Sequence, residues 1–515
     1  MRIFDTYVQK LKYKVLTELA RQTWVGNDAF SVFNDIANQV VKKGEPTMSC
    51  CIYKDRAIVA ERIRIALGGK KEDHNVIQVI DIACDECPVA GHVVTDLCRG
   101  CVAHACVDAC KLGAITVDSH QKAEIDKSKC VECGKCAKSC PYSAIANFKR
   151  PCERACKVDA ISMAPDGVAQ IDSEKCIECG ACVYKCPFGA TLDVSSITDI
   201  IKTIVDSDDN KNYHVHAIVA PAIAGQFQYA KAGQIITAIR ELGFYAVEEV
   251  ALGADIVAYK EAQELQEKGF LTSSCCPAFV KYIKMKFPQL AEHISHNLSP
   301  MAETGKLIKE QDPDAKIVFI GPCTAKKGEV RKPEVHQYVD YVMTFEELQA
   351  MIDSKDIAVD QLPETELDTA TYYGRVFART GGLSEAVTEA VREQKAAAEA
   401  AKADAPDGAG ASGAVASGEA GASGKPASGD GACDGDSADS KPFVFDPIVC
   451  DGIDSCKTAL LRASKGLLPN NFIEGMVCTD GCIGGAACMS HGNADKRAID
   501  NYGKKATHKE IRDVL

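Results

Sequence analysis

The chain has 515 residues, of which 46% are hydrophobic and 25% charged, and its formal net charge is −13. That length predicts about three domains, and no apolar run reaches the roughly 18 residues of a membrane helix, which excludes a membrane-spanning protein. The acidic excess argues against binding to nucleic acid or anionic membranes and favours a basic or small redox partner. The amino-terminal residues mix lysines with apolar residues and lack a signal-peptide cleavage site, so we expect a cytoplasmic protein.

Residues 1–78 are predicted to form a helical segment. Stretches such as TYVQKLKYKVLTELA and AIVAERIRIAL place apolar residues three and four positions apart, as an amphipathic helix does. The adjacent Cys50 and Cys51 lack the spacing of a metal site, which favours buried thiols over ligands.

The 27 cysteines are too regularly spaced for core filling, and a reducing cytoplasm does not support that many disulfides. Two runs of the form C-x2-C-x2-C-x3-C-P match the bacterial ferredoxin pattern that holds 4Fe–4S clusters, whereas zinc ribbons lack this full spacing. Residues 79–195 are therefore predicted to form an α+β ferredoxin-like domain. Its best-supported cluster ligands are Cys130, Cys133, Cys136, Cys140, Cys176, Cys179, Cys182 and Cys186.

The tails of these runs belong to an internal repeat, C-x3-C-[PK]-x-x-A, which occurs four times. The third copy lacks a C-x2-C pair just upstream, and the pair Cys84 and Cys87 lies before the whole block. If that pair completes the third copy, four accessory clusters are expected; otherwise one half-unit has decayed and as few as two remain. The further candidate ligands are Cys84, Cys87, Cys98, Cys101, Cys106, Cys110, Cys152 and Cys156.

From about residue 212, predicted strands and helices alternate, which indicates α/β layers around a largely parallel sheet. We place this domain in two parts, residues 205–395 and 442–515. The intervening residues 396–441 are rich in Ala, Gly and Ser and predict a disordered insertion, with Cys433 as a free thiol.

Three cysteine motifs lie in the α/β part, each near the end of a predicted strand, where α/β folds place their chemistry. They are TSSCCP at 272–277, GPCTAKKGE at 321–329 and EGMVCTDGC at 474–482. Without one member of the adjacent pair, the motifs leave four cysteines that could hold another cubane: Cys276, Cys323, Cys478 and Cys482.

These three motifs, in this order, resemble the signatures of the iron-only, or [FeFe], hydrogenases, and the resemblance covers residues 80–510. That family holds an H-cluster, a 4Fe–4S cubane bridged by a cysteine to a diiron centre with CO, cyanide and a dithiolate bearing an amine. The resemblance implies an α/β catalytic domain of two lobes around parallel sheets. It implies that Cys276, Cys323, Cys478 and Cys482 ligate the cubane, with Cys482 the bridge. It further implies a cofactor pocket formed by Ala220, Pro221, Ala222, Pro300, Met301, Pro322 and Met476.

The resemblance also implies a proton relay. Cys275 matches the thiol that exchanges protons with the bridgehead amine, and Glu261, Ser295 and Glu264 match the relay that leads outward from it. Lys326 matches the lysine that donates a hydrogen bond to a cyanide ligand. We expect the neighbouring Lys327 to lie on the surface.

Several positions depart from the best-known catalysts of that family. Gly321 stands where a methionine is usual, Phe279 replaces a tryptophan, Met301 a glutamine and Ala222 a serine. Cys488 matches no known role. The ligands are thus retained in a pocket whose walls differ, which leaves the direction and rate of turnover open.

The leading hypothesis is an enzyme that interconverts H2 with protons and electrons and exchanges electrons with a ferredoxin-like carrier. Its partners would include the maturation proteins that deliver the diiron unit. One alternative is a slow-turnover sensor of H2 or redox state. Another is a non-catalytic iron–sulfur electron-transfer or scaffold protein, against which the retention of Cys275 argues.

Overall fold

The computed structural model describes residues 4–27, 31–44, 49, 51–70, 73–84, 87, 90–403 and 443–515. The predicted insertion begins at residue 396, but helix α19 (Gly382–Ala403) continues through its first eight positions. The rest of the predicted insertion, including Cys433, lies outside the described residues, as does Cys50. Within the described parts of the chain, no helix is long and apolar enough to cross a membrane.

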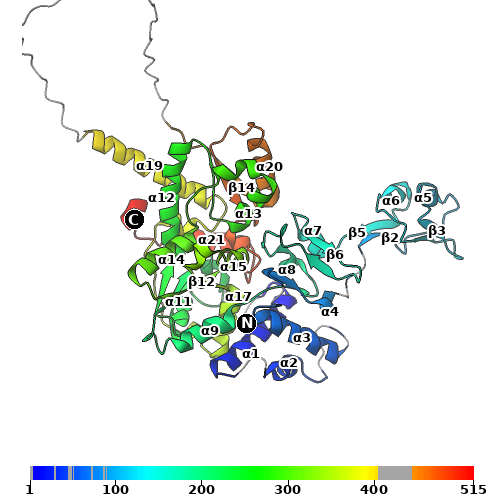
Figure 1. Ribbon diagram of the computed structural model, residues 1–515, viewed down its shortest axis with the longest axis horizontal. Helices are drawn as coiled ribbons and strands as arrows, with labels where there is room; N and C mark the ends of the chain where they lie inside the picture. The colour runs from blue at the N-terminus through cyan, green and yellow to red at the C-terminus, as the bar shows by residue number, and fades with distance from the viewer. Residues whose placement is uncertain are drawn as a thin grey trace, which may run out of the picture.

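The amino-terminal segment is helical, and α1 packs against the α/β part of the molecule (Figure 1). A capping box in which Thr6 and Gln9 satisfy each other's backbone N–H starts α1. Val15, Leu16 and Leu19 form its buried stripe. The helices of this segment are α1 (Tyr7–Trp24), α2 (Phe33–Val40) and α3 (Ile52–Ala66).

The cysteine-rich region consists of two α+β units in series, each with short antiparallel strand pairs and two single-turn helices. Figure 1 shows the unit with α5 and α6 farthest from the rest, and the unit with α7 and α8 beside the α/β part. The strands pair as β1 (Ile77–Val79) with β8 (Thr191–Asp193), β2 (Gly91–Val94) with β5 (Ile145–Phe148), β3 (Ile115–Val117) with β4 (Ala123–Ile125), and β6 (Ile161–Met163) with β7 (Ala169–Ile171). The helices are α4 (Asp81–Cys84), α5 (Ala105–Asp108), α6 (Lys135–Ser139), α7 (Pro151–Ala155) and α8 (Ala181–Lys185).

The α/β part contains two parallel sheets, so the predicted fold class is confirmed. The first sheet has the order β10-β9-β12-β13 and the second β11-β15-β14. The second joins both segments of the domain, because β11 comes from the first segment and β14 and β15 from the second. The strands are β9 (Val215–Val219), β10 (Ala246–Glu249), β11 (Leu271–Thr272), β12 (Lys316–Gly321), β13 (Tyr341–Thr344), β14 (Pro447–Asp451) and β15 (Phe472–Met476).

Helices cover both sheets, and the long α12 packs against α14, α18 and α19. The strands of the first sheet are buried, with Ile218, Val318 and Ile320 fully inaccessible. The helices are α9 (Ile197–Asp206), α10 (Ile223–Gln226), α11 (Ala232–Glu241), α12 (Val250–Lys268), α13 (Pro277–Lys286), α14 (Pro300–Gln311), α15 (Ala325–Glu329), α16 (Pro333–His336), α17 (Phe345–Ser354), α18 (Tyr372–Val376), α19, α20 (Gly452–Ala463) and α21 (Asn493–Gly503). Short 3-10 turns occupy Pro288–His293, Val359–Gln361, Cys482–Gly484 and Ile511–Val514.

A buried ionic network joins the three parts of the molecule. Asp193 of β8 lies 2.5 Å from the ammonium of Lys12 in α1 and 2.7 Å from that of Lys327 in α15. Lys327 also pairs with Glu347 of α17 at 2.8 Å, and Lys12 with Glu346 at 2.9 Å. The expectation that Lys327 lies on the surface is therefore wrong: its side chain is 4% exposed because it neutralises two buried carboxylates.

Candidate active site and cluster-binding cysteines

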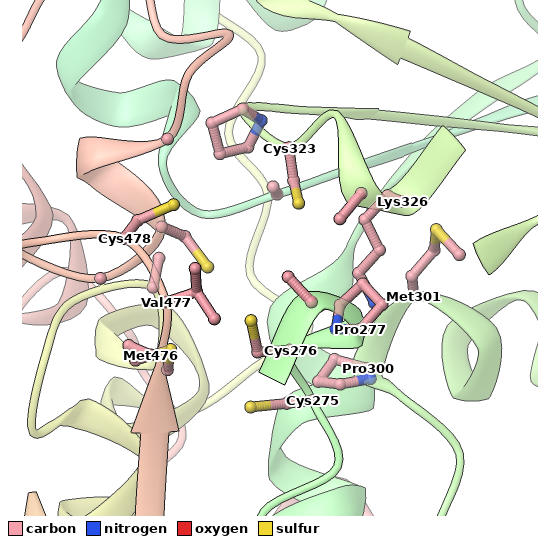
Figure 2. A pocket seen from close by; sticks show the side chains of 18 of the residues that line it. Cys275, Cys276, Pro277, Pro300, Met301, Cys323, Lys326, Met476, Val477 and Cys478 are labelled. Atoms are coloured by element: carbon pink, nitrogen blue, oxygen red, sulfur yellow. The ribbon is translucent and has the colours of Figure 1, made fainter. Parts of the chain in front are cut away.

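The three cysteine motifs of the α/β part meet in one cavity between the two sheets. Cys275 and Cys276 follow β11 and precede α13, whose first residue is Pro277. Cys323 follows β12, and Cys478 and Cys482 lie beyond the end of β15. All five cysteines line the cavity. Figure 2 shows the sulfur atoms of Cys276, Cys323 and Cys478 directed into a common space, with Cys275 beside Cys276.

The four expected ligands influence one another electrostatically, as close neighbours do. Burial and, after it, the negative charge of Cys276 raise the pKa of Cys323 to about 11. Burial likewise raises the pKa of Cys482 to about 12, with Cys323 and Cys276 acting in the same direction. Burial and the charge of Cys323 also raise the pKa of Cys478. Four thiolates in one dry site need positive charge to hold them, and iron ions would provide it.

The rest of the cavity wall is mostly apolar. It includes the expected pocket residues Ala220, Pro221, Pro300, Met301, Pro322 and Met476, together with Val250, Ala254, Phe319 and Phe377. Apart from the cysteines, Lys326 is the one ionisable side chain among the described residues that line the cavity. Its Nζ forms an ion pair with Glu329 Oε2 at 2.6 Å. Burial opposes the charge of Lys326, yet Glu329 raises its pKa.

Two positions that depart from the family pattern have a structural explanation. Gly321 and Phe319 lie two residues apart on β12, and a Cβ atom at Gly321 would lie 2.5 Å from the ring of Phe319. The Phe319 ring therefore fills the space that a larger side chain at 321 would need. Ala222 is not among the residues that line the cavity; it packs in the core at the start of α10.

The residues expected to form the proton relay are adjacent to one another and to Cys275. Glu261 is fully buried on α12, and its Oε1 accepts hydrogen bonds from the N–H and hydroxyl of Ser274 at 3.3 and 3.5 Å. Burial raises the pKa of Glu261 to about 7, against the influence of the Ser295 hydroxyl. Ser295 donates to Glu264 Oε2 at 3.3 Å. Burial, followed by the charge of Glu261, raises the pKa of Cys275.

The outer end of this row of side chains, beyond Glu264, carries no sequence motif. Glu264 Oε1 lies 2.7 Å from both Lys268 Nζ and His296 Nδ1, and Asn297 donates to Glu264 Oε2 at 2.9 Å. Although burial opposes it, these contacts lower the pKa of Glu264. The His296 side chain is 70% exposed, so the row from Cys275 ends at solvent. The i, i+4 spacing of Glu264 and Lys268 was a signal that sequence reasoning could have used.

The sixteen amino-terminal cysteines separate into groups of neighbours. In the unit next to the α/β part, burial, together with the charges of Cys186, Cys84 and Cys87, raises the pKa of Cys152 to about 11. Burial likewise raises the pKa of Cys179 to about 12, with Cys176 and Cys156 contributing. Cys84 and Cys87 thus lie beside the third repeat, as one of the two sequence hypotheses requires.

The outer unit shows corresponding neighbours. Burial raises the pKa of Cys106, and the charges of Cys140 and Cys101 contribute. Burial also raises the pKa of Cys136, with contributions from Cys130 and Cys133. In each of the four repeats, the backbone N–H of the alanine donates to the sulfur of the cysteine four residues earlier, at 3.2 to 3.4 Å. The pairs are Ala114 with Cys110, Ala144 with Cys140, Ala160 with Cys156, and Ala190 with Cys186.

The cysteine-rich region reaches the cavity through one loop. Cys179 is among the residues that line the cavity. The next residue, Gly180, has φ +72°, and a Cβ atom there would lie 2.6 Å from Thr324 Oγ1 and 2.7 Å from Ala486 Cβ. Thr324 donates to the carbonyl of Glu178 at 2.7 Å. The close approach of the two domains at this point requires glycine.

Three cysteines outside the predicted sets are buried near the site. Cys488 Sγ donates to the carbonyl of Ile483 at 3.2 Å, which steadies the turn that carries Cys482. Cys456 Sγ donates to the carbonyl of Met476 at 3.5 Å, and its neighbour Cys450 is also fully buried. These contacts are structural.

Comparison with known proteins agrees with this geometry. Residues 213–486 match the family model described as iron only hydrogenase large subunit, C-terminal domain. The chain belongs to the iron-only hydrogenase family. Residues 97–144 and 150–190 match a 4Fe–4S dicluster domain, so the protein is an iron–sulfur member of that family.

The relatives include enzymes and an assembly factor. Iron hydrogenase 1 of Clostridium pasteurianum is 30% identical over 308 residues, covering 54% of this chain and 52% of its own length. The cytosolic Fe-S cluster assembly factor NAR1 of Kluyveromyces lactis is 37% identical over 95 residues, covering 18% and 20%. A variant of [FeFe]-hydrogenase HydA1 from Chlamydomonas reinhardtii has 19% identity and a TM-score of 0.46, covering 62% of this chain and 92% of that one. The chain spans about half the length of the curated hydrogenases it matches.

Proposed function

We propose that this chain is an enzyme that interconverts H2 with two protons and two electrons. The observation that carries the proposal is the position of Cys275 at the cavity wall, at the inner end of a row of polar side chains that reaches solvent at His296. A scaffold has no use for a proton path into an apolar cavity. An enzyme that consumes or releases protons there needs one.

The cavity fits an H-cluster. Cys276, Cys323, Cys478 and Cys482 would hold its cubane, with Cys482 as the bridge to the diiron unit. When bound, the cluster supplies the redox-active iron chemistry that interconverts H2 with protons and electrons. The apolar walls exclude water from this site, and Lys326 is placed to donate a hydrogen bond to an anionic ligand such as cyanide.

Protons would move through side chains of this chain. Cys275 would exchange its Sγ proton on the cavity side and pass protons to and from Glu261 on the other. A pKa of about 7 lets Glu261 both accept and donate near neutral pH. Ser295 would pass the proton to Glu264, and His296 would exchange it with water.

Electrons would travel through the cysteine-rich region. The groupings of neighbours support four accessory 4Fe–4S clusters. In two-cluster ferredoxins the fourth cysteine of each run serves the other cluster. In the unit next to the cavity, one cluster would be held by Cys156, Cys176, Cys179 and Cys182, and a second by Cys84, Cys87, Cys152 and Cys186. In the outer unit, one cluster would be held by Cys110, Cys130, Cys133 and Cys136. The other would be held by Cys98, Cys101, Cys106 and Cys140. A ferredoxin-like carrier would dock at the outer unit.

Iron analysis tests this count. Four accessory clusters and an H-cluster of six irons give about 22 iron atoms per chain, whereas two accessory clusters give about 14. Loss of the one cluster that contains Cys84 and Cys87 would leave about 18 iron atoms, and a value near 14 would mean that the repeats at Cys106 and Cys152 hold no clusters.

A slow-turnover sensor and a non-catalytic scaffold are the competing functions. The changed cavity wall at Gly321 and Met301 favours the sensor, and the match to an assembly factor favours the scaffold. The infrared spectrum of the protein matured with its diiron unit separates the scaffold from the other two, because metal-bound CO and cyanide absorb where protein groups do not. H2 turnover with a reduced electron carrier then separates enzyme from sensor.

Two variants sharpen this experiment. Cys275→Ala is expected to retain the CO and cyanide bands while turnover falls at least about 100-fold, since it removes only the proton donor. Cys276→Ala is expected to lose the bands as well, since it removes a ligand. Equal loss of the bands in both variants would refute the division between shuttle and ligand, and absence of bands from the unaltered protein would refute the enzyme.

A further inference from the structure

A second cluster of ligating side chains lies at the opposite end of the first sheet from the cavity. His214 and His216 are two residues apart at the amino-terminal end of β9, so their side chains lie on the same side of the strand. Asp312 ends α14 and leads into β12, the strand that pairs with β9. One ligand atom from each of the three residues lies within 4.8 Å of the others.

The distances suit a metal ion. His214 Nδ1 lies 2.7 Å and His216 Nε2 3.8 Å from Asp312 Oδ2. Ligands bound to zinc at 2.0 to 2.2 Å in a tetrahedron lie about 3.3 to 3.6 Å apart. The two observed separations lie on either side of that range.

One ring nitrogen of His216 also points to a missing ligand. The His216 side chain is 9% exposed, and its Nε2 is buried without a hydrogen-bond partner among the residues that the structure describes. If the cluster were only two ion pairs, His214 with Asp312 and His216 with Glu248, that nitrogen would remain unsatisfied, which costs free energy. A metal ion at this point gives Nε2 its missing partner.

The surroundings of the two rings match those of metal-bound histidines. Glu248 Oε1 lies 2.8 Å from His216 Nδ1, and such a carboxylate fixes the ring with Nε2 directed at the metal. Tyr245 stacks on His214 at 3.8 Å between ring centroids, which fixes the second ring. The side chains of His214 and Asp312 are 39% and 29% exposed, so water can reach the remaining coordination position.

We propose that His214, His216 and Asp312 bind one divalent transition-metal ion of the zinc class, with Glu248 supporting His216. Two imidazoles with one carboxylate favour such an ion over Mg²⁺ or Ca²⁺, which take oxygen ligands. Along the chain, His216 lies about 13 Å and His214 about 20 Å from Ala220 of the cavity wall, at roughly 3.3 Å per residue. The site joins the paired strands β9 and β12, whose other ends carry Pro221 and Cys323 of the cavity wall. Its role is to clip these strands together, and H2 turnover does not depend on it directly.

The test uses the protein with its iron–sulfur clusters loaded, because empty cysteine sites would bind zinc. The holoprotein is equilibrated with ZnCl2 and freed of loose metal, and bound zinc is counted and examined by X-ray absorption. We expect one zinc per chain with nitrogen and oxygen ligands at about 2.0–2.1 Å. His216→Gln and Asp312→Asn should weaken binding at least 100-fold, and Glu248→Gln about 10-fold or more.

A matched control is His336→Gln on the exposed α16, which should bind zinc as the unaltered protein does. Zinc should also raise the thermal midpoint of the unaltered holoprotein and of His336→Gln by several degrees, but not that of His216→Gln. Zinc bound only by sulfur at about 2.3 Å, or zinc bound equally well by His216→Gln, would overturn the proposal.

Discussion

At the scale of single residues, Phe319 and Gly321 together determine the shape of one part of the cavity wall, because the Phe319 ring and any side chain at position 321 compete for the same space. Phe319 occupies the space beside Gly321, so Gly321→Met alone would overpack β12. We expect that variant to lose about 1–3 kcal/mol of stability. Phe319→Ala alone should lose about 3–5 kcal/mol through the cavity it leaves. The double variant should be more stable than the sum of the two losses predicts, which denaturant unfolding of all four proteins measures. Additive losses would show that the two positions do not share a space.

Glu261 is the second residue whose environment predicts a measurable effect. Its burial raises its pKa to about 7, so both protonation states are populated at neutral pH. Glu261→Gln cannot release a proton, and we expect turnover to fall at least about 100-fold at every pH between 6 and 8. Glu261→Asp keeps a carboxyl group and should retain more activity. The infrared bands of the metal site should be unchanged in both variants. Equal activity of the Gln and Asp variants would remove Glu261 from the relay.

At the scale of elements, the loop between Cys179 and α8 determines how closely the cysteine-rich region approaches the cavity. Gly180→Ala places a Cβ atom within 2.7 Å of Thr324 and Ala486 and in a left-handed backbone conformation. We expect a loss of about 2–4 kcal/mol from strain and overpacking together, and slower electron transfer between the proposed cluster at Cys179 and the cavity. Gly113→Ala is the matched control, because Gly113 has a similar φ of +61° and open space around its Cβ position. If both variants lose equal stability, close approach is not the reason for glycine at 180.

The sequence predicted the helices, strands and cluster motifs better than it predicted the contacts between them. The C-x2-C runs and the strand–helix alternation predicted the α+β and α/β parts, because spacing and periodicity are local properties of the chain. Lys327 was misplaced on the surface, since only the folded molecule brings Asp193 and Glu347 to it. His296 was missed for the same reason: its contact with Glu264 spans 32 residues. Phe319 belongs to no sequence motif. That its ring fills the space beside Gly321 follows only from the direction of the side chain in the folded protein.

At the scale of the whole molecule, three parts of the chain share the ionic network around Asp193. Figure 1 shows α1 beside α17, and β8 supplies Asp193 between Lys12 of α1 and Lys327 of α15. Burial alone would raise the pKa of Asp193, but the two ammonium groups lower it below its ordinary value. A lowered pKa means that the ionised Asp193 stabilises the fold above the ordinary pKa of about 4, and that this stabilisation is lost as pH falls below it. Across pH 5 to 8 the contribution of Asp193 should therefore be constant.

Asp193→Asn tests this network. It leaves Lys12 and Lys327 buried with one fewer counter-charge, and removal of one partner from a buried ion pair costs about 3–5 kcal/mol. We expect a loss of this size in denaturant unfolding at both pH 5 and pH 8, together with faster hydrogen exchange in α1, β8 and α17. Asp208→Asn serves as control, because its pair with Lys211 is exposed and should contribute about 0–1 kcal/mol. If Asp193→Asn costs no more than the control, or if faster exchange is confined to β8, the network does not hold the three parts together.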